Sequence, residues 1–405
     1  MKHLYTALAL FTSSTLLAQD CSTGRYVTAN LFPNVTVTSA VVYGSNTGVA
    51  GGTQTLRLDV YQPTGDLATD RPAVIVAFGG SFISGTRTDA GVVAVCQDLA
   101  KRGYVAIAPD YRVGFFFPNV ATTTRAVMRG AHDMKAVVRY LRKSVAELGN
   151  PYLIDPERII TGGISAGAIS AIHATYLNEE SEIPTVLVPE MPALGGVEGN
   201  SGNAGYSSVP FACYSFSGAL GDTLWMLPGD VPLASIHEVG DGVVPYYTQE
   251  VSVIGIPTGL IASGSHDIHI RANNAGMVNC FRSYPGSGHV GYLSSDFAMA
   301  MDWTAQFLGQ LSCGATVTCG DVTAGIIAPA NNAFSITPNP TTGEIRLQLP
   351  EATQVELFDA SGRSVMQDRF GAGAARMDLS SLPAGIYVAH VTGTTVGTFR
   401  IVRAD

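Results

Sequence analysis

A serine that could act as a nucleophile lies in Gly163-Ile164-Ser165-Ala166-Gly167, which has the spacing Gly-x-Ser-x-Gly. Ile159 and Ile160 before this motif predict a strand, and the residues from Ala166 to Tyr176 predict a helix. A serine on such a sharp strand-to-helix turn is exposed above the sheet, and the flanking glycines let neighbouring backbone pack without Cβ clashes. We therefore predict that Ser165 is a nucleophile; the alternative is a small-residue turn whose hydroxyl is only hydrogen-bonded.

The base for this serine is sought among the eight histidines of the chain. A serine hydroxyl needs a base to take its proton, and on a strand–turn–helix motif of this kind the chain order is serine, acid, histidine. His289 fits this order and lies in a glycine-rich loop, residues 285–291, after a predicted strand. His237 precedes the predicted acid, which argues against it. His289 is the predicted base, with a surface-loop histidine as the alternative.

The acid that orients the base should lie between the serine and the histidine in sequence. Asp241 follows an apolar strand at a turn, in the stretch from Val239 to Pro245. Three other acidic residues are rivals: Asp222, Glu238 and Asp267. A turn aspartate that merely caps backbone N–H groups is the alternative interpretation of Asp241. We predict a triad of Ser165, Asp241 and His289.

Two backbone N–H groups should stabilise the oxyanion that forms when a serine attacks a carbonyl group. Ala166, directly after the serine, supplies one of them. The other is predicted from the loop Phe78-Gly79-Gly80-Ser81-Phe82, where Gly80 or Ser81 is the donor. The alternative is an ordinary turn at the end of a strand.

The remaining residues of metal-ligating type predict no metal or organic cofactor. His266 and His269 form a short His-x-x-His pair, but no third zinc ligand is evident. The six cysteines lack zinc-type pairing, and an even number in an exported chain suggests disulfides. Cys313 and Cys319 are close enough in sequence to close a local loop. We predict structural bridges or buried thiols.

The elements that must position these residues alternate between strand and helix from about Thr55 to Leu311. A pattern of this kind predicts an α/β fold with a doubly wound, mostly parallel sheet. Residues 181–208, rich in Gly, Pro and Asn, interrupt it and predict a long excursion over the sheet edge. After Leu311 the sequence pattern changes. A linker of small and polar residues is followed by short stretches that alternate between apolar and polar residues, which predict a small all-β sandwich.

The ends and the composition point to an exported protein. A basic start, an apolar run from Leu4 to Leu17 and Ala18 at a plausible cut site predict a signal peptide; a membrane anchor is the alternative. No later stretch is apolar and long enough for a membrane span. The net charge is -9, with no basic stripe, which argues against nucleic acid as a partner. We predict a signal peptide at 1–18, a catalytic domain at 19–312, a linker at 313–332 and a C-terminal domain at 333–405.

Several stretches together resemble the α/β-hydrolase superfamily, in particular secreted bacterial carboxylesterases of the feruloyl-esterase-like and hormone-sensitive-lipase-like branches. They are Leu58–Tyr61, Phe78–Phe82, Asp110–Arg112, the turn at Ser165, His237–Pro245 and Gly288-His289. Where that family usually has His-Gly-Gly-Gly, this chain has Phe78 and Ser81 at the first and fourth positions. Asp110, Tyr111, Arg112 and Asp133 match family positions that look structural, so they are left out of the predicted site.

The end of the chain resembles a C-terminal sorting domain of the type IX secretion system. The resemblance is carried by Thr337–Glu344, Phe358–Arg363 and Leu382–Tyr387. It implies export across the outer membrane, to the cell surface or beyond, with the secretion machinery as a partner and with possible removal of the tail. A carbohydrate-binding sandwich is the alternative.

These observations lead to the hypothesis of a secreted serine hydrolase that cleaves carboxylic esters through an acyl-enzyme. The predicted substrate is a small-molecule or polysaccharide-linked ester. Two alternatives remain: a serine peptidase of the prolyl-oligopeptidase type, against which the lack of a preceding β-propeller weighs, and a non-catalytic binding protein on the same fold.

Overall fold

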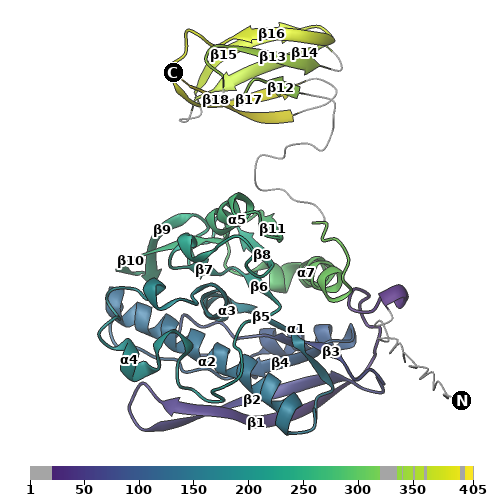
Figure 1. Ribbon diagram of the computed structural model, residues 1–405, viewed down its shortest axis with the longest axis vertical. Helices are drawn as coiled ribbons and strands as arrows, with labels where there is room; N and C mark the ends of the chain where they lie inside the picture. Colours follow the sequence, from purple (N-terminus) through teal and green to yellow (C-terminus); the bar gives the residue numbers. More distant parts are fainter. Residues whose placement is uncertain are drawn as a thin grey trace, which may run out of the picture. The chain divides into compact units, whose positions relative to one another are not determined.

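The computed structural model of the chain describes residues 21–319, 335–339, 341–349, 352–359, 363–392 and 397–404. The predicted signal peptide and most of the predicted linker lie outside the described residues. The chain divides into two compact units, Met1–Asp321 and Val322–Asp405, which are drawn in purple to green and in yellow-green in Figure 1.

The first unit is built around an eight-stranded sheet with the strand order β1-β2-β4-β3-β5-β6-β8-β11. β1 and β2 pair antiparallel, as do β2 and β4, and every pairing from β4 to β11 is parallel. The inner strands are apolar and buried on both faces, as expected for parallel strands that helices cover. Their bounds are β1 (Val35–Thr47), β2 (Thr53–Pro63), β3 (Arg71–Ile75), β4 (Val105–Pro109), β5 (Ile154–Ile164), β6 (Ala212–Phe216), β8 (Leu233–Glu238) and β11 (Asn279–Tyr284).

Helices cover the two faces of this sheet (Figure 1). From β3 the chain moves to β4 in one direction along the sheet, whereas from β4 to β5 and from β5 to β6 it moves in the other. Since such crossovers are right-handed, the connecting helix α1 and the later helices α2 and α3 lie on opposite faces. α7 packs against α1, and α2 against α3. The helices are α1 (Ala90–Lys101), α2 (Val120–Glu147), α3 (Ala166–Tyr176), α5 (Ser265–Asn274) and α7 (Phe297–Ser312).

The reversal of direction determines where a site can form. β3 and β5 are neighbours in the sheet, and the helices that follow them leave toward opposite faces. The loops after these strands therefore diverge and leave a crevice at the carboxyl ends, where open α/β sheets bind their ligands. The predicted oxyanion loop follows β3, and the predicted nucleophile follows β5.

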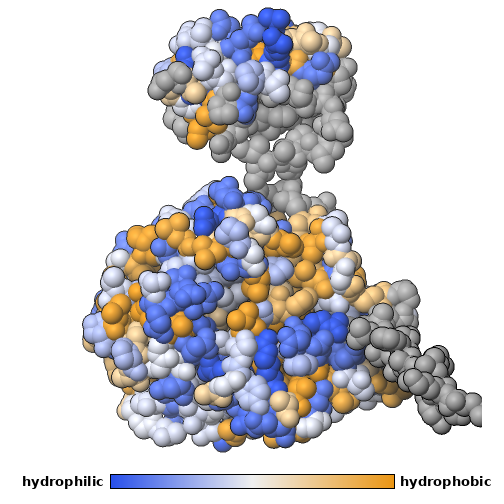
Figure 2. Space-filling view, in the orientation of Figure 1, coloured by the Kyte–Doolittle hydropathy of each residue, from blue (hydrophilic) through white to orange (hydrophobic). Residues whose placement is uncertain are grey.

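A small antiparallel sheet adds a wall beside this crevice. It contains β7 (Ala219–Leu220), β9 (Thr248–Val253) and β10 (Ile256–Gly264), in the order β7-β10-β9. Apolar side chains gather on the surface over these strands in Figure 2, and Ile254, Ile256 and Ile261 are exposed there. The alternating sequence of a half-buried hairpin explains why the outer face remains in contact with water while the inner face lines the crevice.

The excursion predicted at residues 181–208 is present as irregular chain with short helices. These are η2 (Glu180–Glu182), α4 (Met191–Leu194) and η3 (Gly196–Glu198). Ser201 anchors it, since its hydroxyl donates to the Asp133 carboxylate on α2 at 2.6 Å. Other short helices are η1 (Cys21–Thr23), η4 (Thr223–Trp225) and α6 (Tyr292–Ser295).

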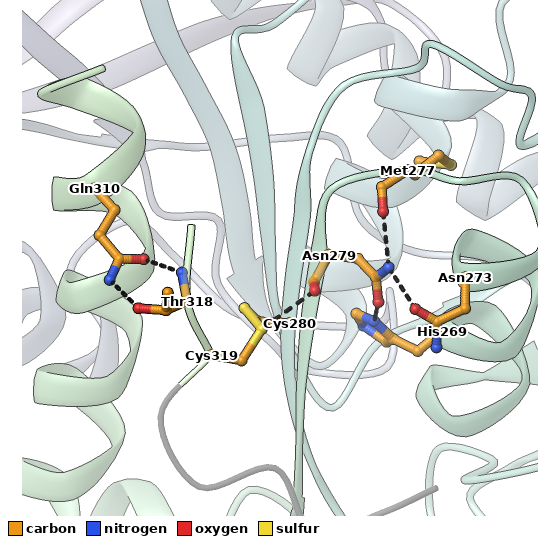
Figure 3. Close-up of a disulfide and its surroundings, with 8 residues drawn as sticks. All are labelled: His269, Asn273, Met277, Asn279, Cys280, Gln310, Thr318 and Cys319. Atoms are coloured by element: carbon orange, nitrogen blue, oxygen red, sulfur yellow. Dashed lines mark hydrogen bonds between the residues drawn. A yellow bond between two sulfur atoms is a disulfide. The ribbon is translucent and has the colours of Figure 1, made fainter. Parts of the chain in front are cut away.

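Two disulfides join segments that are far apart in the sequence. Cys21 pairs with Cys313, and Cys280 pairs with Cys319. Figure 3 shows the second bridge, which fastens the chain after α7 to β11, while the Gln310 side chain holds Thr318 beside it. A local Cys313–Cys319 loop is therefore wrong, because the two thiols meet different parts of the fold. Cys96 and Cys213 are buried free thiols.

The second unit consists of two antiparallel sheets, with the orders β12-β13-β16 and β15-β14-β17-β18. Alternate residues of β13 and β14 are buried, among them Ile345, Leu347, Val355 and Leu357, and they form a small core. The strands are β12 (Ser335–Thr337), β13 (Glu344–Leu349), β14 (Thr353–Phe358), β15 (Ser364–Phe370), β16 (Gly373–Asp378), β17 (Gly385–Thr392) and β18 (Gly397–Arg403).

The predicted fold class is confirmed in both units: an α/β unit with a mostly parallel sheet, followed by a small all-β unit. The sequence interpretation missed several elements of the first unit, namely β1, β6, the β7-β10-β9 sheet and α5. β1 and β9 carry mostly exposed side chains, so neither presents the apolar run that marks a buried strand.

Candidate active site

Ser165 lies at the sharp turn between β5 and α3, as the motif predicted. Its backbone has φ 55° and ψ −119°, a conformation that L residues rarely adopt and that is typical of a nucleophile turn. Any side chain at the two glycines would collide with the backbone after β3. A Cβ on Gly163 would lie 2.7 Å from the Ala77 carbonyl oxygen, and a Cβ on Gly167 would lie 2.2 Å from the same oxygen. The turn thus requires glycine on both sides of the serine.

The loop after β3 passes directly beside this turn. A Cβ built on Gly79 would lie 3.2 Å from the Cβ of Ser165, so the backbone approaches the serine closely. Gly80 has φ +119°, and a Cβ there would lie 2.2 Å from the Ser84 carbonyl oxygen. Ser81 lines the same cavity as Ser165 and Ala166. The structure therefore brings the loop with both candidate donors, Gly80 and Ser81, to the serine.

His289 and Asp241 form a chain of hydrogen bonds that ends at Ser165. The distance from His289 Nε2 to Ser165 Oγ is 2.7 Å, and from His289 Nδ1 to Asp241 Oδ2 it is also 2.7 Å. Ser165 and Asp241 are 5% and 6% exposed, whereas the His289 side chain is 19% exposed. The imidazole can therefore exchange protons with a bound molecule while its acid remains buried.

Asp241 is held as a carboxylate by four donors. Its Oδ1 accepts from the backbone N–H groups of Val243 at 2.8 Å and Val244 at 3.0 Å, and its Oδ2 faces His289 and His237. Burial by itself would raise the pKa of Asp241, but the hydrogen bonds from His237, His289 and Val243 outweigh it and hold that pKa well below its ordinary value. The acid stays ionised wherever the protein is folded at ordinary pH.

His237 is the functional contact that the sequence interpretation missed. Its Nε2 lies 3.3 Å from Asp241 Oδ2 and 3.3 Å from the Val244 carbonyl oxygen, and its Nδ1 lies 2.9 Å from Ser265 Oγ. Since both neighbours of Nε2 are acceptors, that nitrogen must carry a proton and donate it. Chain order argued against His237 as the base. It gave no signal that a histidine four residues before the acid would contact that acid.

The rival acids have other partners. Glu238 is buried, and its carboxylate accepts from the backbone N–H of Gly291 at 3.2 Å, so it supports the loop of the histidine rather than its ring. Asp222 accepts from the N–H of Leu224, and Asp267 accepts from Thr248 and faces His266.

In the described part of the chain, no group of three or more potential ligands, around the His-x-x-His pair or elsewhere, is close enough to hold a metal ion. Figure 3 shows His269 bonded to Asn279, and its other nitrogen faces Ser235 Oγ at 2.8 Å. Burial lowers the pKa of His269 to about 4, with a partial offset from the Asn279 hydrogen bond. This histidine is a neutral core residue.

Residues 58–200 match the family model described as BD-FAE. The chain carries a BD-FAE domain. This domain is an esterase domain of the α/β-hydrolase class, so the predicted enzyme class, a carboxylic ester hydrolase, is confirmed. The matched range includes the predicted oxyanion loop and Ser165, and it ends before Asp241 and His289.

Residues 335–402 match the model described as the secretion system C-terminal sorting domain. The resemblance of the tail to such a domain is thereby confirmed, and with it a location at the cell surface or outside the cell by type IX secretion. In the described part of the chain, the helices are too short or too polar to span a membrane.

Solved structures similar to this chain include esterase 2 of Thermogutta terrifontis in several forms. The form phosphoramylated by tabun is 21% identical over 69% of this chain and 96% of that one, with a TM-score of 0.48. The propionate-bound form is 23% identical over 69% and 95%, with a TM-score of 0.46. No curated protein matches the chain.

Beside Ser165 the first unit has a cavity of about 440 Å³. Its walls come from the start of α2, from α3, from residues 181–186 and from the β9–β10 hairpin. This volume is in the range of ligand pockets, so the site has room for a substrate next to the serine.

Proposed function

We propose that this exported esterase hydrolyses carboxylic esters through an acyl-enzyme on Ser165, with His289 as base and Asp241 as the acid that orients it. The observation that carries the proposal is the continuous chain of two 2.7 Å contacts from Ser165 Oγ through the imidazole to the Asp241 carboxylate. A nucleophile, a base and an orienting acid at such distances are the requirements for this chemistry.

In the first half of the reaction, Ser165 Oγ forms a bond to the acyl carbonyl carbon while its proton passes to His289 Nε2. The negative charge on the carbonyl oxygen is met by the N–H of Ala166 together with that of Gly80 or Ser81. When the tetrahedral adduct collapses, the bond to the alkoxy oxygen breaks and His289 gives its proton to that oxygen. Asp241 stabilises the imidazolium throughout and keeps the ring oriented.

In the second half, His289 takes a proton from water, and the resulting hydroxide attacks the acyl carbon of the ester on Ser165. Collapse of the second adduct returns the proton to Ser165 Oγ and releases the carboxylic acid. The exposed edge of the imidazole gives water access to the base once the alcohol has left.

The experiment compares wild type with Ser165→Ala on p-nitrophenyl esters and on a proline amide, using the full chain. We expect hydrolysis of the esters, little cleavage of the amide, and a fall of at least about 10⁴-fold in kcat for Ser165→Ala. Ser170→Ala is the matched control, since this buried α3 serine only donates to the Ala166 carbonyl oxygen. Equal rates for wild type and Ser165→Ala would contradict the proposal, and faster amide cleavage would favour a peptidase.

A further inference from the structure

The cavity beside Ser165 is lined mainly by apolar side chains. Among them are Val127, Ile169, Val251, Val253, Leu260 and Ala262. Its volume of about 440 Å³ exceeds that of a cavity of ~150 Å³ that suffices for benzene. A pocket of this lining and size gains free energy by removing apolar surface of a ligand from water.

The polar groups of the cavity wall do not offer a cationic partner for a negatively charged ligand. His173 is buried: its Nδ1 lies 2.8 Å from the Ile169 carbonyl oxygen, and its Nε2 accepts from the Gly221 N–H. Burial lowers the pKa of His173 to about 4, so it is neutral. Glu182 and Asp222 accept from backbone N–H groups at the mouth. Among the described residues that line the cavity, none is a lysine or arginine.

The position of the proton donor argues that the cavity takes the acyl part of the ester. His289 must give its proton to the alkoxy oxygen, so the alcohol part of the ester lies toward His289. The cavity is lined by Ser165, by Ala166 and by Ser81 of the oxyanion loop, and His289 is not among its described lining residues. The chain that leaves the carbonyl carbon away from His289 therefore enters the cavity, while the alcohol lies at the exposed edge of the imidazole.

We propose that this cavity binds an uncharged, apolar acyl chain of about six or more carbons, and that the enzyme selects esters by their acyl part and tolerates varied alcohols. The inference rests on the proposed function of Ser165. It excludes acetyl esters and acyl groups with a terminal carboxylate as preferred substrates.

The β9–β10 hairpin offers a sharp test of where the acyl chain lies. Leu260 and Ile261 are neighbours on β10, at a point where the strand register shifts, and they differ in what they face. Leu260 lines the cavity, whereas Ile261 is 52% exposed. A tryptophan at either position places a large side chain on the same strand. Only the tryptophan at position 260 would fill part of the cavity, so the one at position 261 is the control.

The first measurement is kcat/KM of the full chain for p-nitrophenyl acetate, butyrate, hexanoate and octanoate, and for the monoester of glutaric acid. We expect a rise of about fourfold for each added methylene until the cavity is filled. The glutarate monoester should react at least about 100-fold more slowly than the hexanoate, because its carboxylate would lose water without a cation to meet it.

The second measurement compares Leu260→Trp with Ile261→Trp. We expect Leu260→Trp to lower kcat/KM for the octanoate at least about tenfold and to leave that for the acetate within about twofold. Ile261→Trp should leave both unchanged.

A p-nitrophenyl hydroxycinnamate is measured beside this series. Three results would overturn the inference while the proposed function stands: hydrolysis of the acetate with no gain on longer chains, faster hydrolysis of the hydroxycinnamate than of the hexanoate, or equal effects of the two tryptophan variants. If wild type hydrolyses none of these esters faster than Ser165→Ala, the proposed function itself fails.

Discussion

Two aspartates of the first unit, Asp133 and Asp241, are both buried and each accepts from four donors, but the donors differ in kind. Asp133 on α2 is 0% exposed and accepts from the backbone N–H of Arg112, from its guanidinium at 2.9 to 3.1 Å, and from Ser201 Oγ. Asp241 is 6% exposed and also has four donors, two of them backbone N–H groups and two of them histidines. Both carboxylates are fully hydrogen-bonded, but only Asp133 faces a permanent cation.

The difference teaches what makes a buried carboxylate reactive. The charge of Asp133 is balanced by Arg112 at all times. Through Ser201, this ion pair holds the excursion at residues 181–208 against α2, and Asp133 has no described partner whose charge changes. In the proposed reaction, the charge of Asp241 gains a cation beside it only when His289 takes the proton of Ser165. Its attraction is then strongest in the transition state, which is where an interaction must be strongest to accelerate a reaction.

The largest effect is expected for Asp241→Asn. The amide can no longer hold the His289 tautomer whose Nε2 accepts a proton, so kcat on p-nitrophenyl hexanoate should fall about 10⁴-fold. The thermal midpoint, followed by circular dichroism, should show a folded protein. A variant that keeps a tenth of the wild-type kcat would remove Asp241 from the proposed triad.

Asp133→Asn should have the opposite result. It leaves the Arg112 guanidinium buried without its partner, which should lower the free energy of unfolding by about 3–5 kcal/mol. The measurement is urea unfolding, together with kcat per folded molecule, which should stay within a few-fold of wild type. An unchanged stability with a large loss of kcat would mean that the two aspartates do not differ as described.

His237 tests whether Asp241 depends on its second imidazole. His237→Ala removes a donor to a buried charge, worth about 1.5–3 kcal/mol, so kcat should fall roughly 10- to 100-fold. KM should stay unchanged, because His237 is buried behind Asp241 and not in the cavity. His237→Gln can place an amide N–H where Nε2 lies, and we expect it to restore much of kcat. If His237→Ala yields less folded protein but keeps a normal kcat per folded molecule, His237 contributes to stability and not to the reaction.

The smallest effect concerns pH. The hydrogen bonds of Asp241 outweigh its burial and lower its pKa in the folded state, so its ionised form contributes stability above the ordinary aspartate pKa of about 3.9, and this contribution is lost as the pH falls below it. The stability difference between wild type and Asp241→Asn should therefore be constant above about pH 5 and shrink toward pH 3. Urea unfolding at three pH values measures it; a difference that grows on acidification would have the wrong sign.

The sequence allowed the main parts of the candidate site to be predicted because its signals are local. The glycines around Ser165 and the position of Asp241 and His289 at the ends of apolar runs follow from short stretches of chain. The contact of His237 with Asp241, the pairing of Cys280 with Cys319, and the wall formed by Leu260 depend on where distant segments meet. Neither strand alternation nor chain order contains that information.

The Cys21–Cys313 bridge has a consequence for force rather than for chemistry. It closes a span of 292 residues, and the sheet and the proposed triad lie inside that span. Force that enters the first unit from its N-terminal side reaches Cys21 before β1, whereas force from the linker reaches Cys319 first and passes through its bridge to Cys280 on β11. Unfolding of this unit from the tail would therefore load the Cys280–Cys319 bridge before the Cys21–Cys313 bridge, and both bridges must be reduced before the chain can be fully extended.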